Sequence, residues 1–114
     1  MERSKIRRIN AGEVLFLTGT IADEAFLIRS GNIEIFDLVD GQEKIYAVRG
    51  PGDIIGEIAL LDGQRRSASA RALEDSELMA VTPALLRSEL DRSPILIQRI
   101  VQACLKIIRR ANAR

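Results

Sequence analysis

Residues 56–69 combine the backbone and side-chain groups that bind an anion. The segment reads GEIALLDGQRRSAS, with Gly56 and Glu57 at its start and Arg66 followed by Ser67 near its end. Glycine lets backbone approach a ligand closely, and the free amides of the helical turn that can follow it favour a negative group. Arg66 adds a permanently charged fork of donors that matches phosphate oxygens, and Ser67 adds a hydroxyl. The segment therefore predicts a phosphate-binding site.

The same segment resembles the phosphate-binding cassette of the cyclic nucleotide-binding domain family, which includes catabolite-activator-type regulators, cyclic-nucleotide-gated channels and protein kinase A regulatory subunits. The resemblance is carried by GEIALL and, after a short loop, by RSAS. It implies that Arg66 meets the exocyclic oxygens of a cyclic phosphate and that Glu57 accepts a hydrogen bond from the ribose 2′-hydroxyl. The predicted ligand-binding residues are Gly56, Glu57, Ile58, Ala59, Arg66, Ser67 and Ser69.

Simple structural interpretations of these residues exist as well. Glu57 can be a carboxylate that is favoured by the positive end of a helix, and paired arginines after a glycine turn often belong to a solvated loop. The Ser-Ala-Ser sequence that follows Arg66 favours this arginine as the ligand contact. We therefore expect Arg65 to be a surface charge.

Length and composition indicate a single domain, 1–114, that binds rather than catalyses. The 114 residues, 46% of them hydrophobic, suffice for one core without an appended reader domain, so an output partner or domain is expected outside the chain. Histidine is absent, which removes the usual base for a nucleophile and the commonest transition-metal ligand. No run approaches the ~20 apolar residues of a membrane span, and no secretory signal is visible. We expect a cytoplasmic, non-enzymatic protein with no metal, no membrane insertion and no cofactor other than cyclic AMP or cyclic GMP as its ligand.

Short apolar runs punctuated by glycine predict a mainly β barrel over residues 5–82. Asp40-Gly41 lies between two such runs and predicts a tight hairpin. The alternation of residues 67–72 predicts a strand with one polar face and one face of small buried residues, and it places Arg66 at the start of that strand. A second match to the family, from Thr18 to Ile35, extends the resemblance to roughly residues 10–90. It implies an eight-stranded jelly-roll barrel, or double-stranded β-helix, with a short helix in the cassette.

Two C-terminal helices are predicted, over 83–91 and 94–112, because Thr82-Pro83 and Ser93-Pro94 each place a capping residue before a proline. The second helix carries an apolar stripe wide enough to pack on the barrel and on something else, such as a partner helix in a homodimer or the base of the ligand. On its distal half, Ile107 and Ile108 are predicted to form a lid. Cys104 is expected to be a small buried hydrophobic residue.

Charge is unevenly distributed along the chain. Residues 1–86 hold 10 Lys/Arg against 14 Asp/Glu, a net −4, whereas residues 87–114 hold 7 against 2, a net +5. A basic helix can contact nucleic acid, a membrane or an acidic partner. Because the basic residues are mixed through an apolar stripe and no helix-turn-helix follows, we favour contact within the chain or in a dimer over direct nucleic-acid contact.

Three functions compete at this point. The leading hypothesis is a regulatory cyclic nucleotide sensor, in which the ligand binds between the barrel and the last helix and shifts the population of that helix's positions. An enzyme of the cupin type would need clustered histidine ligands, which the chain lacks. A structural or dimerisation module without ligand is the alternative, and the presence of both Arg66 and Glu57 argues against it. The sequence leaves cyclic AMP and cyclic GMP equally open.

Overall fold

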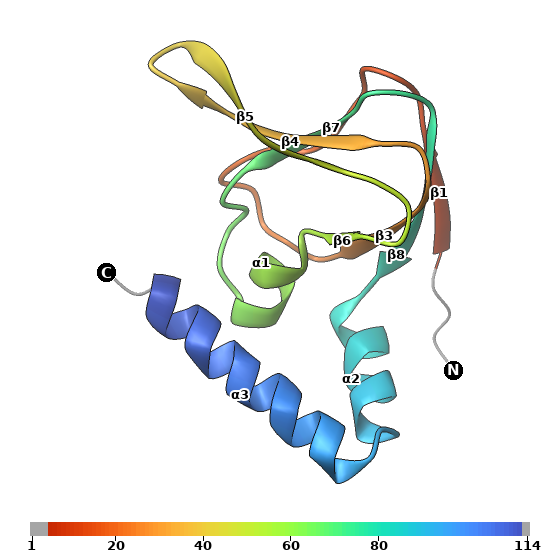
Figure 1. The fold of residues 1–114 in the computed structure, drawn as a ribbon, viewed down its shortest axis with the longest axis vertical. Coiled ribbons are helices and arrows are strands. Elements are labelled where there is room, and N and C mark those ends of the chain that lie inside the picture. Colours follow the sequence, from red (N-terminus) through yellow and green to blue (C-terminus); the bar gives the residue numbers. More distant parts are fainter. Residues whose placement is uncertain (1–4, 113–114) are drawn as a thin grey trace.

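The computed structural model describes residues 5–112, in which eight strands form two four-stranded antiparallel sheets that face each other (Figure 1). The first sheet has the order β1 (Lys5–Ile9), β8 (Ser76–Val81), β3 (Ala25–Ser30), β6 (Ile54–Ile55). The second has the order β2 (Val14–Phe16), β7 (Ser69–Ala72), β4 (Ile33–Val39), β5 (Gln42–Arg49). The predicted mainly β jelly-roll barrel is confirmed, and the outer limits of the predicted 1–114 domain lie outside the described residues.

The core fills the space between the two sheets. Its largest fully buried side chains are Ile28, Ile33 and Leu78, and β7 contributes Ala70 and Ala72, which are 0% and 1% exposed. Small residues on β7 let the two sheets approach closely, since interiors are packed without large voids. The predicted polar face of this strand is only partly present, because Ser69 is buried as well.

The β4–β5 hairpin turns at the predicted Asp40-Gly41 pair. Both residues have positive φ, 54° for Asp40 and 80° for Gly41, as a two-residue hairpin turn requires. The register runs from Val39 opposite Gln42 to Ile33 opposite Arg49. Arg49 therefore ends β5 directly opposite a core residue.

Arg66 does not start a strand, contrary to the prediction, because β7 begins three residues later. Instead, its backbone is fixed by the loop after β2. The amide of Arg66 donates to the carbonyl of Thr20 over 2.9 Å, and the amide of Gly19 donates to the carbonyl of Arg66 over 2.8 Å. Two hydrogen bonds from a distant segment thus take the place of the expected strand ladder.

Three helices complete the fold: α1 (Glu57–Asp62), α2 (Pro83–Asp91) and α3 (Ile95–Asn112). The side chain of Thr82 caps α2 by accepting from the amide of Leu85 over 3.1 Å, as the Thr-Pro pair predicts. The third helix begins one residue after Pro94. Among the described residues, no helix is long and apolar enough to cross a membrane.

Helix α3 runs past α1 and α2 on the side that faces away from the sheets (Figure 1). It contacts them along a narrow line, and a cavity of about 280 Å³ remains between the three helices, lined in part by Leu60, Leu86 and Val101. Much of the apolar stripe stays in solvent: Ile107 is 66% exposed. Cys104 is exposed too, so its predicted burial is wrong.

Candidate functional site

A cavity of about 370 Å³ opens between α1, β6 and the inner side of the β4–β5 pair. Its volume lies in the range of small-ligand sites, roughly 300–1,000 Å³. Six of the seven predicted ligand-binding residues line it, namely Gly56, Glu57, Ile58, Ala59, Arg66 and Ser67.

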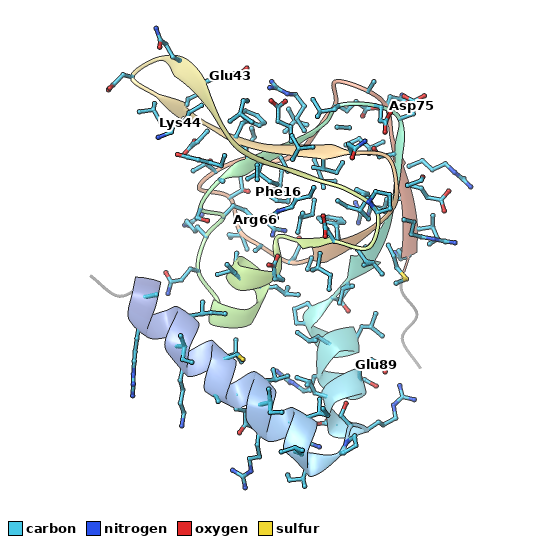
Figure 2. All side chains as sticks on the ribbon, viewed as in Figure 1. Phe16, Glu43, Lys44, Arg66, Asp75 and Glu89 are labelled. Carbon is cyan, nitrogen blue, oxygen red and sulfur yellow. The ribbon has the colours of Figure 1, made fainter. Side chains whose placement is uncertain are left out.

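Arg66 is the most constrained charged side chain at this cavity, and only 5% of it is exposed. Its Nη1 donates to the carbonyl of Gly56 over 2.9 Å and its Nη2 donates to the carbonyl of Glu24. The guanidinium lies 4.1 Å from the centre of the Phe16 ring, and the two side chains lie together at the centre of Figure 2. Such stacking on an aromatic face stabilises a cation.

One donor of Arg66 is left over. Its buried Nε finds no hydrogen-bond partner among the described residues. Burial lowers the pKa of the guanidinium, and the nearby charges of Asp23 and Glu24 oppose that shift, so the group remains a cation. A buried donor without a partner costs free energy, and an anion beside it would remove that cost.

Gly56 is required by the close approach of Arg66. An added Cβ would lie 2.4 Å from the Nη1 of Arg66, and the residue has a φ of 75°. This left-handed conformation turns the chain into α1, and the first amides of the helix, which have no intrahelical acceptor, receive no side-chain cap from Gly56. Gly56 and Glu57 line the cavity together with Arg66, whose guanidinium bonds to the carbonyl of Gly56.

Charges of both signs line the cavity. Arg49 and Arg66 contribute two cations, and Asp53 and Glu57 contribute two carboxylates. The carboxylate of Asp53 is used within its own loop, where it accepts from the amide of Gly50 over 2.9 Å. An arrangement of this kind suits a ligand that has an anionic end and also hydroxyl donors.

Residues 6–93 match the model of the family described as "Cyclic nucleotide-binding domain". The chain belongs to this family. It is 33% identical over 102 residues to the Cyclic AMP receptor protein of Thermus thermophilus, an alignment that covers 89% of this chain and 47% of that protein. The domain therefore spans about half the length of this relative.

Solved structures give the same assignment. The half-site-occupied form of the EAL enzyme Bd1971 matches with a TM-score of 0.91 and 33% identity, covering 97% of this domain and 100% of that chain. The cAMP-bound form of that enzyme matches with a TM-score of 0.77 over 95% of this domain, and the cGMP-bound form with 0.79 over 94%, both at 34% identity. In these two forms the match covers 29% of the enzyme chain.

Ser69 differs from the other predicted site residues of the cyclic nucleotide-binding domain, because it does not line the cavity. It is 4% exposed, and its Oγ accepts from the amide of Thr18 over 2.9 Å. The two hydroxyls are 3.1 Å apart, and that of Thr18 donates to Asp37 over 3.0 Å. In this arrangement Ser69 links β7 to the loop after β2, while the exposed Ser67 is the serine at the cavity.

Ile107 and Ile108 are not at the cavity either. They belong to α3, which lies beyond α1 as seen from the sheets (Figure 1). A lid would require movement of this helix toward the barrel, so the lid stays a prediction.

Seven residues that line the cavity were not among the predicted site residues: Phe16, Ile35, Arg49, Asp53, Ile54, Ile55 and Ala68. Phe16 belongs to an apolar run that indicates only a core strand, and nothing local shows that an arginine stacks on it. Arg49 follows the short apolar run 45–48 and directly precedes a Gly-Pro-Gly turn, where a charge normally indicates a solvated loop. The period of two along β5 is the signal that would have placed Arg49 on the same face as Ala47.

Proposed function

We propose that this domain is a regulatory sensor that binds a cyclic purine mononucleotide in the 370 Å³ cavity. The observation that carries the proposal is the buried Arg66, whose Nε lacks a partner among the described residues and which lies beside the uncapped start of α1. Together they provide a cation and several N–H donors for one phosphate. By family resemblance, Glu57 would accept from the ribose hydroxyl.

The names of the solved relatives support this choice of ligand. The Bd1971 enzyme has a cAMP-bound and a cGMP-bound form, and both superimpose on this domain. We therefore propose cyclic AMP or cyclic GMP as the ligand and an output partner or domain outside the chain. The domain binds its ligand without transforming it, and a cytoplasmic location remains an expectation.

Thermal unfolding with added nucleotide tests the proposal. A ligand that binds only the folded state stabilises it by about 2.7 kcal/mol at a hundredfold excess over Kd. We expect cyclic AMP or cyclic GMP to raise the Tm, whereas 5′-AMP does so much less. The absence of a shift with millimolar cyclic AMP, cyclic GMP and cyclic di-GMP would favour the structural or dimerisation module.

We propose that α3 is the responding element. Leu60 of α1 faces the same interhelical cavity as Val101 of α3, so a ligand that displaces α1 also changes the contacts of α3. Hydrogen exchange with and without ligand is the measurement. Unchanged protection over 100–110, alongside clear protection over 56–69, would remove the role of α3 and of the lid while leaving ligand binding intact.

The exposed apolar face of α3 supports a second proposal, a homodimer through this helix. Ile95 and Leu96 are 64% and 66% exposed, although apolar residues on a helix normally find cover. Sedimentation equilibrium tests this point, and a monomer at all concentrations would exclude the dimer.

A further inference from the structure

A second arginine, Arg49, lines the cavity from the wall that β4 and β5 form. Arg49 is the last residue of β5, and its register partner on β4 is Ile33, which is fully buried in the core. Residues directly opposite each other on paired strands share a face of the sheet. Arg49 therefore lies on the inner face, where it lines the cavity.

The charge of Arg49 is not used by the protein itself. Its side chain is exposed, and it makes no ion pair or hydrogen bond with the rest of the chain within residues 5–112. Asp53 and Glu57 line the same cavity, yet neither pairs with it. Because its charge is unpaired, the guanidinium of Arg49 is available to bind a ligand.

The phosphate already has a binding wall on the other side. Arg66 is fixed against the carbonyls of Gly56 and Glu24, next to the free amides of α1. Figure 1 shows α1 on one side of the barrel and β5 on the other. The cavity wall also carries the aliphatic side chains of Ile35 and Ile54, which can pack against the faces of a purine ring. This leaves Arg49 for the edge of the base.

Arginine discriminates between purine edges because it only donates. Guanine presents two acceptors, O6 and N7, on the edge that faces away from the ribose, whereas adenine presents the N7 acceptor next to an amino donor. A guanidinium can therefore bond guanine twice and adenine only once. We propose that Arg49 is a specificity-determining residue that gives this site a preference for a 6-oxo purine, cyclic GMP or cyclic IMP, over cyclic AMP. The inference rests on the proposed function.

Titration calorimetry of the whole chain with cyclic GMP, cyclic IMP and cyclic AMP tests the assignment. The wild-type chain should bind the two 6-oxo nucleotides more tightly than cyclic AMP. Arg49→Leu should weaken cyclic GMP and cyclic IMP about tenfold and cyclic AMP less than about threefold, in line with the discrimination of a bidentate pair. Arg49→Lys should behave like Arg49→Leu, since lysine keeps the charge but lacks the planar fork. Lys44→Leu, on the same strand but away from the cavity, is the matched control and should change none of the three affinities.

The outcomes separate this inference from the proposed function. Equal loss for all three nucleotides would place Arg49 at the phosphate and overturn the inference. Unchanged affinities in Arg49→Leu would overturn the inference as well. So would a wild-type preference for cyclic AMP that the variant keeps. In both cases the proposed nucleotide binding would stand. If the wild-type chain bound none of the three, the proposed function itself would be wrong, and the inference with it.

Discussion

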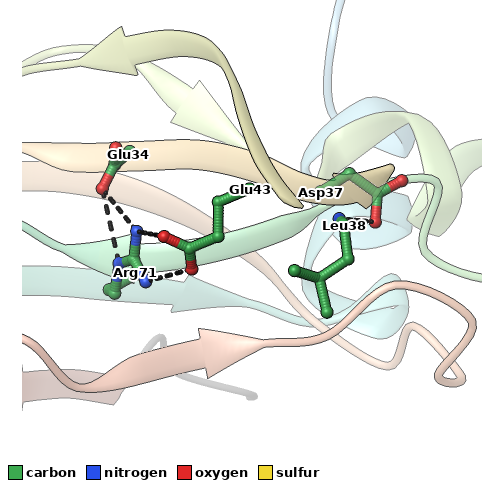
Figure 3. Close-up of polar contacts among 5 residues, drawn as sticks. All are labelled: Glu34, Asp37, Leu38, Glu43 and Arg71. Atoms are coloured by element: carbon green, nitrogen blue, oxygen red, sulfur yellow. Dashed lines mark hydrogen bonds and ion pairs between the residues drawn. The ribbon is translucent and has the colours of Figure 1, made fainter. Parts of the chain in front are cut away.

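Two arginines in this domain stack on phenylalanine rings in nearly the same way and have opposite surroundings. Arg66 lies 4.1 Å from the ring centre of Phe16 at the cavity, and Arg71 lies 4.3 Å from that of Phe36 on β4. Arg71 is held by two carboxylates (Figure 3), at 2.7 Å from Glu43 and 3.0 Å from Glu34. Arg66 is held by backbone carbonyls.

The partners decide what each arginine can do. Hydrogen bonds that Arg71 donates to Glu43, and then to Glu34, raise its pKa, while burial lowers the pKa of Arg66. Carboxylates neutralise the charge of Arg71, so this residue joins β4, β5 and β7 and has little attraction left for an anion. Carbonyls orient Arg66 but leave its net charge in place. The same side chain is thus a structural clamp in one region and a candidate anion receptor in the other.

The largest expected effect comes from removing the side chain of Arg66. Arg66→Ala should weaken cyclic nucleotide binding by more than tenfold, because a hydrogen bond to a charged group contributes about 1.5–3 kcal/mol. Because Arg66 is 5% exposed and donates to two backbone carbonyls, we also expect the free energy of unfolding to fall by about 1–3 kcal/mol.

Arg65→Ala is the matched control for this comparison. Arg65 is exposed and donates to the carbonyl of Gly19 over 3.0 Å, outside the cavity. Calorimetry and urea unfolding should both show little change. Equal losses of affinity in the two variants would mean that the wrong arginine had been chosen.

An intermediate effect should follow from a single methyl group at Gly56. In Gly56→Ala the new Cβ meets the guanidinium of Arg66, whereas in Gly63→Ala it meets no atom within 4 Å. Both glycines have similar positive φ, 75° and 72°, so the backbone strain of about 1–2 kcal/mol is common to both variants. Overpacking adds about 1–3 kcal/mol at Gly56 only. Urea unfolding should show that difference, and equal destabilisation would show that Arg66 moves aside freely.

The smallest expected effect is the pH dependence of stability that comes from the contact between Arg71 and Glu43. The hydrogen bond from Arg71 holds the pKa of the Glu43 carboxyl below its usual value. A lowered pKa in the folded state adds stability above the ordinary glutamate pKa of about 4.3, and this stability is lost as the pH falls through the folded value. Glu43→Gln should therefore be less stable than wild type at neutral pH, with the difference shrinking in acid. Nucleotide affinity should not change, and a loss of affinity would contradict the division between the two arginines.

Local chemistry explains how much of the fold was predictable. The Asp40-Gly41 turn, the Thr82 cap and the GEIALL–RSAS cassette are each specified by residues close together in the chain, so the sequence predicted them well. The contacts that were not predicted join residues that are far apart in the sequence. Phe16 and Glu24, which contact Arg66, are 50 and 42 positions from it in the sequence. Thr18, which donates to the hydroxyl of Ser69, is 51 positions from that residue. The period of α3 correctly predicted a helix but could not show how little of it the barrel covers.

The unfilled space between the three helices has a mechanical consequence. Close-packed interiors transmit a displacement directly, because every atom already touches its neighbour. Leu60 instead enters a cavity of about 280 Å³ shared with α2 and α3, so α1 has slack before it pushes on them. In the proposed sensor, a small movement of α1 would be taken up in this space, and a larger one would reach α3.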